Sequence, residues 1–333
     1  MRTATPALVF VRGKKTLSKT KHAKIETMKR WQIKVEKWHT RAKEKARVMG
    51  LETVPECHFL VLDKPAGEIC QPMVNVAKKL LRLAYGAAMD MRYCAFQKYR
   101  VQETKQEIVL PKEGKVLRTL PLDYGTTLER YASGLIVIGI EKGVKLLGQF
   151  LDGPHVYECT AQFGTATDTL HLQGKVIEES SYTHITKEFM EEMMETCFTG
   201  DIMQAPPIAS GVVYQAIPVQ VHAFKVIEYD LPRVRFHVRC SERTHVSKLV
   251  HDLAHALNSS AHLTELRRSQ CGLFSLDGSI SGDRKYLNSL EPKQLESHLK
   301  HANDVKPGSW PFAPQRARRK AIPRVSPAVI RTE

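Results

Sequence analysis

The sequence lacks several features that would place it in a common class of protein. It has no apolar run near the ~18 residues that a membrane-spanning helix needs. Its seven cysteines are scattered and odd in number, and none is spaced C-x-x-C. It also has no G-x-x-x-x-G-K phosphate loop and no H-E-x-x-H metal motif. These absences favour reduced thiols in an intracellular compartment and argue against a structural zinc site or a nucleotide cofactor.

Acidic residues are missing from the first 25 positions, and this absence makes the charge of the chain uneven. Residues 1–50 hold 15 Lys and Arg but only Glu26, Glu36 and Glu44, a net charge of +12. The whole chain carries +15, so residues 51–333 carry only +3. A strongly basic head on a nearly neutral body suits a polyanion, nucleic acid first and an anionic membrane surface second.

The basic head, residues 1–54, divides into two parts. The acid-poor, hydroxylated composition of residues 1–25 is typical of a mitochondrial transit segment, with a nuclear signal or a disordered basic arm as the alternative. From Thr20 to Val48, apolar residues recur at spacings of three and four, which predicts an amphipathic helix. The composition of the head therefore predicts that the protein is located in the mitochondrial matrix or, alternatively, in the nucleus.

The body of the chain alternates between strand and helix patterns. We expect strands over 58–62, 135–140, 156–163, 219–229 and 233–240, and helices over 74–85, 144–151, 186–197 and 244–257. Residues 86–122 look mixed, with short edge strands near 108–111 and 116–120. From Pro292 the chain loses periodicity and gains proline, which predicts a flexible basic tail over 292–333. This order favours an α+β fold, a largely antiparallel sheet flanked by helices.

One stretch carries the clearest motif. Gly125–Gly134, followed by Leu135, resembles the active-site motif of the TruB family of RNA pseudouridine synthases, roughly G-H-x-G-x-L-D-P-x-A-x-G-x-L. The scaffold residues Leu128, Ala132 and Gly134 match that motif. The position of the family's catalytic Asp holds Glu129, whose extra methylene moves the carboxylate by roughly a bond length.

Further blocks of the same family follow in the right order. They are Leu62–Gly67, Tyr157–Gly174, Phe198–Pro207, Cys240–Leu253 and Leu263–Phe274. The resemblance runs from about Phe59 to Leu287 and is closest to the mitochondrial TruB-like branch. It implies a pseudouridine synthase domain over 55–291, a mixed and largely antiparallel sheet, and too little remaining sequence for the RNA-binding PUA domain of bacterial members.

The resemblance also implies a reaction and a set of residues. The family needs no cofactor: it flips a uridine out of its stack, and one carboxylate acts on the nucleoside. Tyr157 matches the Tyr that stacks on the flipped base, while Ser247 occupies the position of an Arg that faces the carboxylate. His155 occupies the position of a Lys. Candidate catalytic residues are Glu129 and Tyr157, and candidate RNA-binding residues are Lys64, Arg130, His155, Arg243, Lys248, Arg267 and Arg268.

Two functions are consistent with this pattern. The first is a pseudouridine synthase that modifies mitochondrial mRNA, tRNA or rRNA with Glu129 as its carboxylate. The alternative is a catalytically inactive TruB-like RNA-binding or RNA-chaperone protein. Either reading predicts RNA as the partner, a monomer without a membrane-spanning segment, and contact with mitochondrial ribosome or RNA-granule proteins. The basic head and tail are expected to add RNA affinity.

Overall fold

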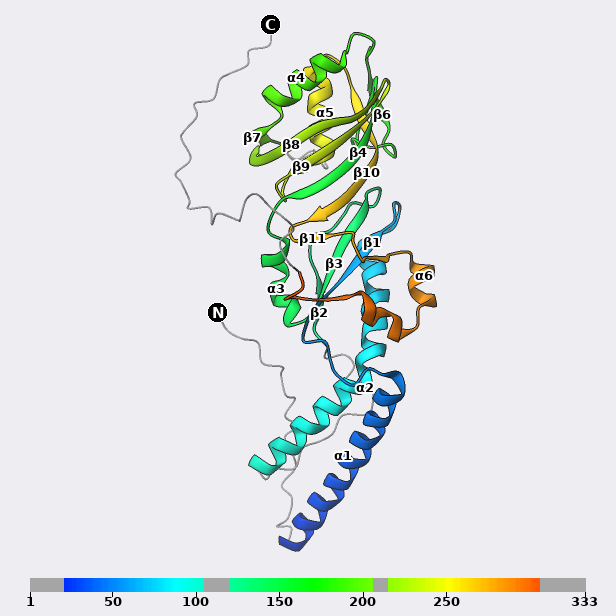
Figure 1. Ribbon diagram of the computed structural model, residues 1–333, viewed down its shortest axis with the longest axis vertical. Helices are drawn as coiled ribbons and strands as arrows, with labels where there is room; N and C mark the ends of the chain where they lie inside the picture. Colours follow the sequence, from blue (N-terminus) through cyan, green and yellow to red (C-terminus); the bar gives the residue numbers. More distant parts are fainter. Residues whose placement is uncertain (1–20, 105–119, 206–214, 306–333) are drawn as a thin grey trace, which may run out of the picture. The chain divides into compact units, whose positions relative to one another are not determined.

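The computed structural model describes residues 21–104, 120–205 and 215–305 (Figure 1). The chain forms two compact units, Met1–Val54 with Leu80–Leu120 and Pro55–Lys79 with Pro121–Glu333. The short strand expected near 108–111 lies outside the described residues, as do Pro206 and Pro207 of the Phe198–Pro207 block. Of the strand expected near 116–120, only Leu120 is described, and it lies in a bend.

The first unit is built from one long helix and from the part of a second long helix that begins at Leu80. α1 (Lys21–Met49) confirms the helix predicted from the periodicity, and it buries an apolar stripe of Trp31, Val35, Trp38, Ala42 and Ala46. The ring of Trp38 lies 5.8 Å from the ring of Tyr93 in α2 (Cys70–Thr104). The expected end of this helix near Tyr85 was wrong, because Ala87, Ala88, Met89 and Cys94 continue its buried side and Gly86 does not interrupt it.

The second unit is built on a large sheet. Its strands are β1 (Cys57–Lys64), β2 (Leu122–Tyr124), β3 (Ser133–Glu141), β4 (His155–Phe163), β7 (Gly200–Gln204), β8 (Ile217–Asp230), β9 (Arg233–Cys240), β10 (Ala261–Cys271), β11 (Phe274–Ser275), β12 (Ile280–Ser281) and β13 (Leu299–His301). The strands predicted at 58–62, 135–140 and 156–163 and the hairpin formed by β8 and β9 are confirmed. β7, β10 and the separate hairpin of β5 (Thr165–Thr167) with β6 (Val176–Glu179) were not predicted as strands.

The sheet order is β12-β1-β3-β10-β4-β9-β8-β7, with β2, β11 and β13 attached at the side. Neighbouring strands are antiparallel, except that β1 pairs with β12 and β3 pairs with β10 in parallel. The predicted α+β fold with a mixed, largely antiparallel sheet is therefore confirmed.

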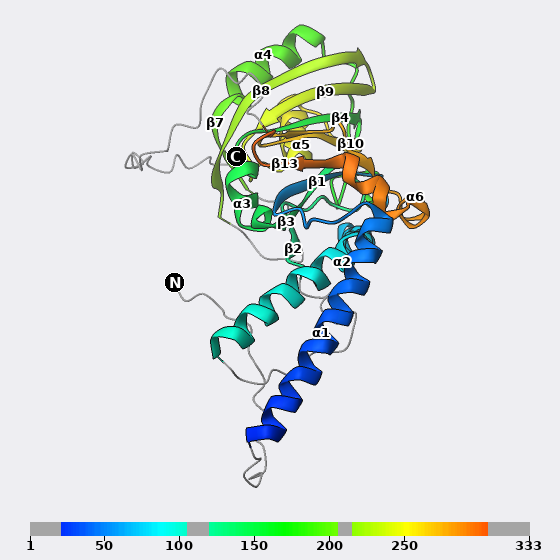
Figure 2. The same cartoon turned by 60° about the horizontal axis from the view of Figure 1, so that its bottom comes forward.

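Helices cover the sheet over two separate cores. α3 (Lys142–Leu151) packs Leu147 and Leu151 against β1 and β3. α4 (Lys187–Cys197) and α5 (Val246–Ala256) pack over β4, β8, β9 and β10 (Figures 1 and 2). The predicted cap of α4 is present, since the Thr186 side chain accepts a hydrogen bond from the amide of Phe189.

The expectation of a flexible tail from Pro292 was wrong for its first part. After α6 (Arg284–Ser289), the 3-10 helix η2 (Pro292–His298) begins with a capping box at Glu291, and β13 then pairs with β1. Residues 306–333 lie outside the described residues. Among the helices that are described, none is long and apolar enough to span a membrane.

Candidate active site

The sheet forks where β3 meets β10. β3 pairs with β1 over the full length of β1, but it pairs with β10 only at Ser133 and Gly134. A cavity of about 280 Å³ lies at this fork. Its lining residues are Ala66, Tyr131, Ser133, Glu158, Cys159, Thr160, Arg235, Thr264, Glu265, Leu266 and Arg267. The loop that carries Glu129 leads directly into β3, so the motif and the cavity lie together.

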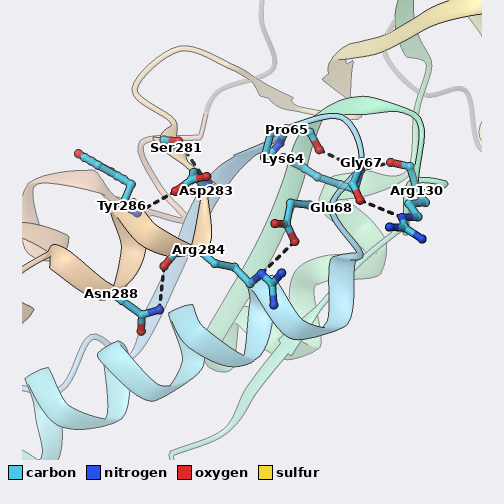
Figure 3. A network of polar contacts seen from close by, with 10 residues as sticks. All are labelled: Lys64, Pro65, Gly67, Glu68, Arg130, Ser281, Asp283, Arg284, Tyr286 and Asn288. Atoms are coloured by element: carbon cyan, nitrogen blue, oxygen red, sulfur yellow. Dashed lines mark hydrogen bonds and ion pairs between the residues drawn. The ribbon is translucent and has the colours of Figure 1, made fainter.

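Lys64 at the end of β1 holds this loop in place. Its side chain is fully buried, and its ammonium donates to the carbonyls of Pro65 and Arg130 at 3.2 and 3.1 Å (Figure 3). It also donates to the carbonyl of Ala132 at 2.5 Å. Burial lowers the pKa of Lys64, but three carbonyl acceptors provide the partners that a buried ammonium needs. We predicted that Lys64 binds RNA; its position instead favours a role in holding the loop.

Arg268 anchors the same loop from β10. Arg268 is 2% exposed, and its guanidinium donates to the carbonyl of Leu135 at 2.7 Å and to that of Thr126 at 3.1 Å. These carbonyls flank Glu129 on both sides in the sequence. Two buried cations therefore fix the loop, and Arg268 also has a structural role where we predicted an RNA contact.

The Glu129 carboxylate lies on the exposed side of this loop. Among the described residues it forms no ion pair. Arg130 directs its Nε to the carbonyl of Gly67 at 3.0 Å, and Lys248 pairs with Asp252 on its own helix. Arg243 is exposed on the turn before α5. The structure thus does not bring a predicted cation against Glu129.

Tyr131 and His171 are site residues that the sequence analysis missed. Their rings stack with centroids 4.1 Å apart and an interplanar angle of 19°. Burial and the nearby Glu129 raise the pKa of Tyr131, and the nearby Ser247 hydroxyl opposes that rise. The Tyr131 hydroxyl is buried without a hydrogen bond of good geometry within the described residues. The sequence could have indicated Tyr131, because it is an aromatic residue two positions after Glu129.

Tyr157 lies in the core beside the loop. Its hydroxyl is 3.3 Å from Nδ1 of His155, whose Nε2 is 3.1 Å from Sγ of Cys271. Burial raises the pKa of Tyr157 to about 12, although Arg268 opposes the rise. Burial and the charge of Arg268 lower the pKa of His155 to about 4. His155 is therefore neutral near pH 7 and 1% exposed, which favours a structural role over the predicted RNA contact.

Two arginines stand at the cavity. Arg267 donates to both carboxylate oxygens of Asp63, at 3.1 and 2.8 Å, and its side chain is 43% exposed. Arg235, which we did not predict, donates to Glu158 at 2.5 Å. Both guanidiniums remain accessible while they are paired, so they can meet phosphate groups near the cavity.

Comparison with known proteins matches this sequence to one family. The model for "TruB family pseudouridylate synthase (N terminal domain)" matches residues 115–246. The chain is 30% identical over 203 residues to tRNA pseudouridine synthase B of Chlamydia muridarum, covering 55% of this chain and 81% of that protein. The chain belongs to the TruB family.

Other relatives of this TruB family chain are matched over a smaller share of their length. It is 34% identical over 193 residues to mouse pseudouridylate synthase TRUB1, covering 52% of this chain and 57% of the relative. It is 30% identical over 193 residues to tRNA pseudouridine synthase B of Geobacter sulfurreducens, covering 53% of this chain and 63% of the relative. The chain thus spans about six tenths of the length of these relatives.

The fold also matches a solved structure. A chain of a Cbf5–Nop10–Gar1 complex superimposes with a TM-score of 0.51 at 19% identity, covering 77% of this chain and 63% of that chain. At this identity the match supports the fold alone.

Proposed function

We propose that this protein binds mitochondrial RNA and isomerises a uridine to pseudouridine, with Glu129 as the reacting carboxylate. In this reaction the bond from the ribose to N1 of uracil breaks, and a new bond forms to C5, which loses its proton while N1 gains one. Substrate and product contain the same atoms, so the reaction needs neither an oxidant nor a reductant. The relatives named as pseudouridine synthases support this reaction class.

The observation that carries the proposal is the anchoring of the Glu129 loop. Lys64 and Arg268 donate to carbonyls on both sides of Glu129, and both are buried. A misplacement of ~1 Å can lower a rate by on the order of 100-fold, so a reacting carboxylate must be held by a rigid support. The loop is built in this way, and Tyr131 beside it offers an aromatic surface at the cavity.

A second function is favoured by one specific observation. Ser247 stands where the resemblance places an Arg, and Glu129 has no ion-pair partner within the described residues. Without a facing cation, the carboxylate loses the group that would orient it. The chain would then bind RNA through the same cavity without changing it.

The test is the release of tritium from RNA labelled at C5 of uridine. The full chain is compared with Glu129→Ala and Glu129→Gln, and with Glu179→Gln as a control for an exposed carboxylate on β6. We expect release by the wild type and by Glu179→Gln, with a loss of on the order of 100-fold or more in both Glu129 variants. RNA binding is measured on the same samples by fluorescence anisotropy.

The outcomes separate the two functions. Release that persists in Glu129→Gln contradicts the assigned carboxylate. If the wild type releases no tritium from mitochondrial RNA but binds it as tightly as Glu129→Ala does, the binding function replaces the catalytic one. Recovery of release in Glu129→Asp alone would show that the longer side chain is what prevents the reaction.

A further inference from the structure

The exposed side of α1 carries a line of basic residues. From Arg30 to Met49, where the side chains of α1 are described, seven Lys and Arg are exposed against two acidic residues, Glu36 and Glu44. Five of the seven follow the helix at spacings of three and four: Arg30, Lys34, Lys37, Arg41 and Lys45. At 100° per residue these five lie within about 80° of one another around the helix axis, over roughly 22 Å. We call these five residues the basic stripe.

Two acidic residues of α1, Glu36 and Glu44, lie beside the basic stripe. Glu36 lies about 140° and Glu44 about 60° from the middle of the stripe around the helix axis, and Glu44 contacts Arg47 at 3.8 Å. Lys37, Thr40 and Arg41 line a shallow hollow together with Ile33 and Glu36. With seven basic residues against two acidic ones, the exposed surface of α1 from Arg30 to Met49 keeps a net positive charge, which suits an anion with a similar row of charges.

The fold of the first unit argues against a membrane as that anion. A helix that lies on a membrane needs an exposed apolar face to insert among the lipids. In α1 that face is buried, with Trp31 at 8%, Val35 at 0% and Trp38 at 5% exposure. The exposed apolar residues of this part of α1 are only Ile33 and Val48, which are four turns apart. The solvent-exposed surface of this part of α1 is therefore charged and has no continuous apolar face that could insert into a membrane.

We propose that the basic stripe of α1 binds the phosphate backbone of RNA and gives the protein a second RNA contact outside the cavity at the sheet fork. The inference rests on the proposed RNA-binding function of the chain. Lys and Arg that neutralise phosphates release counterions, so each contact makes the affinity more dependent on salt. Contacts of Lys and Arg with phosphates do not read the base sequence, so the stripe adds affinity rather than sequence selectivity.

The test uses the full chain and a uridine-containing RNA hairpin labelled with a fluorophore. One variant replaces four stripe residues, as Lys34→Gln, Lys37→Gln, Arg41→Gln and Lys45→Gln. The matched control replaces four exposed lysines of the second unit, as Lys145→Gln, Lys225→Gln, Lys285→Gln and Lys293→Gln. Both variants lose the same net charge, and glutamine keeps a helix propensity close to that of lysine. Circular dichroism confirms that the helices remain.

We expect the stripe variant to bind on the order of 10-fold to 100-fold more weakly at about 0.1 M salt, with its salt slope reduced by about 3. The control should change by less than about threefold. Equal losses in the two variants overturn the inference. So does a stripe variant that keeps its RNA affinity but no longer binds vesicles of anionic phospholipid, because the surface would then be a membrane contact.

A measurement on the unchanged protein guards against misfolding of the variant. Amine labelling followed by mass spectrometry compares each lysine with and without the RNA hairpin. Bound RNA should protect Lys34, Lys37 and Lys45, but not Lys43, which lies about 160° from the middle of the stripe on the same helix. Equal protection of Lys43 contradicts the inference. A wild type that binds no RNA at all overturns the proposed function too, whereas a wild type that binds RNA without tritium release leaves the stripe intact.

Discussion

Single buried polar residues shape this site more than its exposed ones do. Lys64 and Arg268 hold the loop, and His155 joins Tyr157 to Cys271 inside the core. Each has its hydrogen-bonding groups directed to neighbours, as the cost of an unsatisfied buried polar group requires. The sequence marked all three as RNA contacts because charge and family position were the available signals. A linear pattern does not report burial.

His155 makes the stability of the protein depend on pH in a defined window. Its pKa is about 4 in the folded protein against 6.5 ordinarily. The unfolded chain therefore binds more protons between pH 4 and 6.5, so the free energy of unfolding falls as pH falls through this window. We expect the wild type to lose about 2 kcal/mol more than His155→Gln between pH 7 and pH 5. Urea unfolding at the two pH values measures this; equal losses contradict the burial of a neutral His155.

At the scale of elements, the contact between β3 and β10 decides the site. Gly134 has a φ of +110°, and a Cβ built there would lie 2.1 Å from the carbonyl oxygen of Arg268. Only glycine allows the two strands to approach so closely, and beyond this point they diverge to leave the cavity. The structure therefore requires glycine at position 134 of the motif for a reason that is independent of the reaction.

Gly134→Ala tests this contact. We expect a loss of more than about 3 kcal/mol in the free energy of unfolding, since a strained φ and a backbone clash add together. Gly148→Ala is the matched control, because Gly148 lies in α3 with no atom within 4 Å of a built Cβ. It should raise stability by about 0.5–1 kcal/mol, since alanine favours a helix. Urea unfolding of both variants gives the comparison, and a mild effect at Gly134 contradicts the close approach.

At the scale of the whole molecule, charge and fold are distributed unequally. The first 50 residues carry a net charge of +12, whereas residues 51–333 carry +3. The TruB-like sheet with its cavity belongs to the second compact unit, and the basic stripe belongs to the first. We propose that the head has two roles, with residues 1–25 directing the chain to mitochondria and α1 holding RNA.

The targeting role can be measured directly. We expect a fluorescent reporter fused after residues 1–54 to enter mitochondria, because a basic and acid-free segment is drawn to the import machinery. Replacing Arg2, Arg12, Lys14, Lys15 and Lys19 with Gln should leave the reporter in the cytosol. Confocal microscopy with a mitochondrial dye reports both results. Accumulation of the first fusion in the nucleus would support the alternative nuclear signal.

The sequence by itself determined the local elements whose patterns were strong. The apolar period fixed α1 and α5, alternation and turn residues fixed the β8–β9 hairpin, and Thr186 marked the start of α4. The motif blocks fixed the family. These features depend on neighbours a few residues apart, which a linear pattern records.

Only the tertiary structure decided what depends on contacts between distant residues. It extended α2 past Tyr85, brought β13 to β1, and stacked His171 on Tyr131. It also buried the Trp31 and Trp38 side of α1, leaving the basic stripe as the surface that faces solvent. The physical reason is that burial and strand pairing depend on which distant segments come into contact. Lys64 and Ala132, for example, form a hydrogen bond although they are 68 positions apart in the sequence.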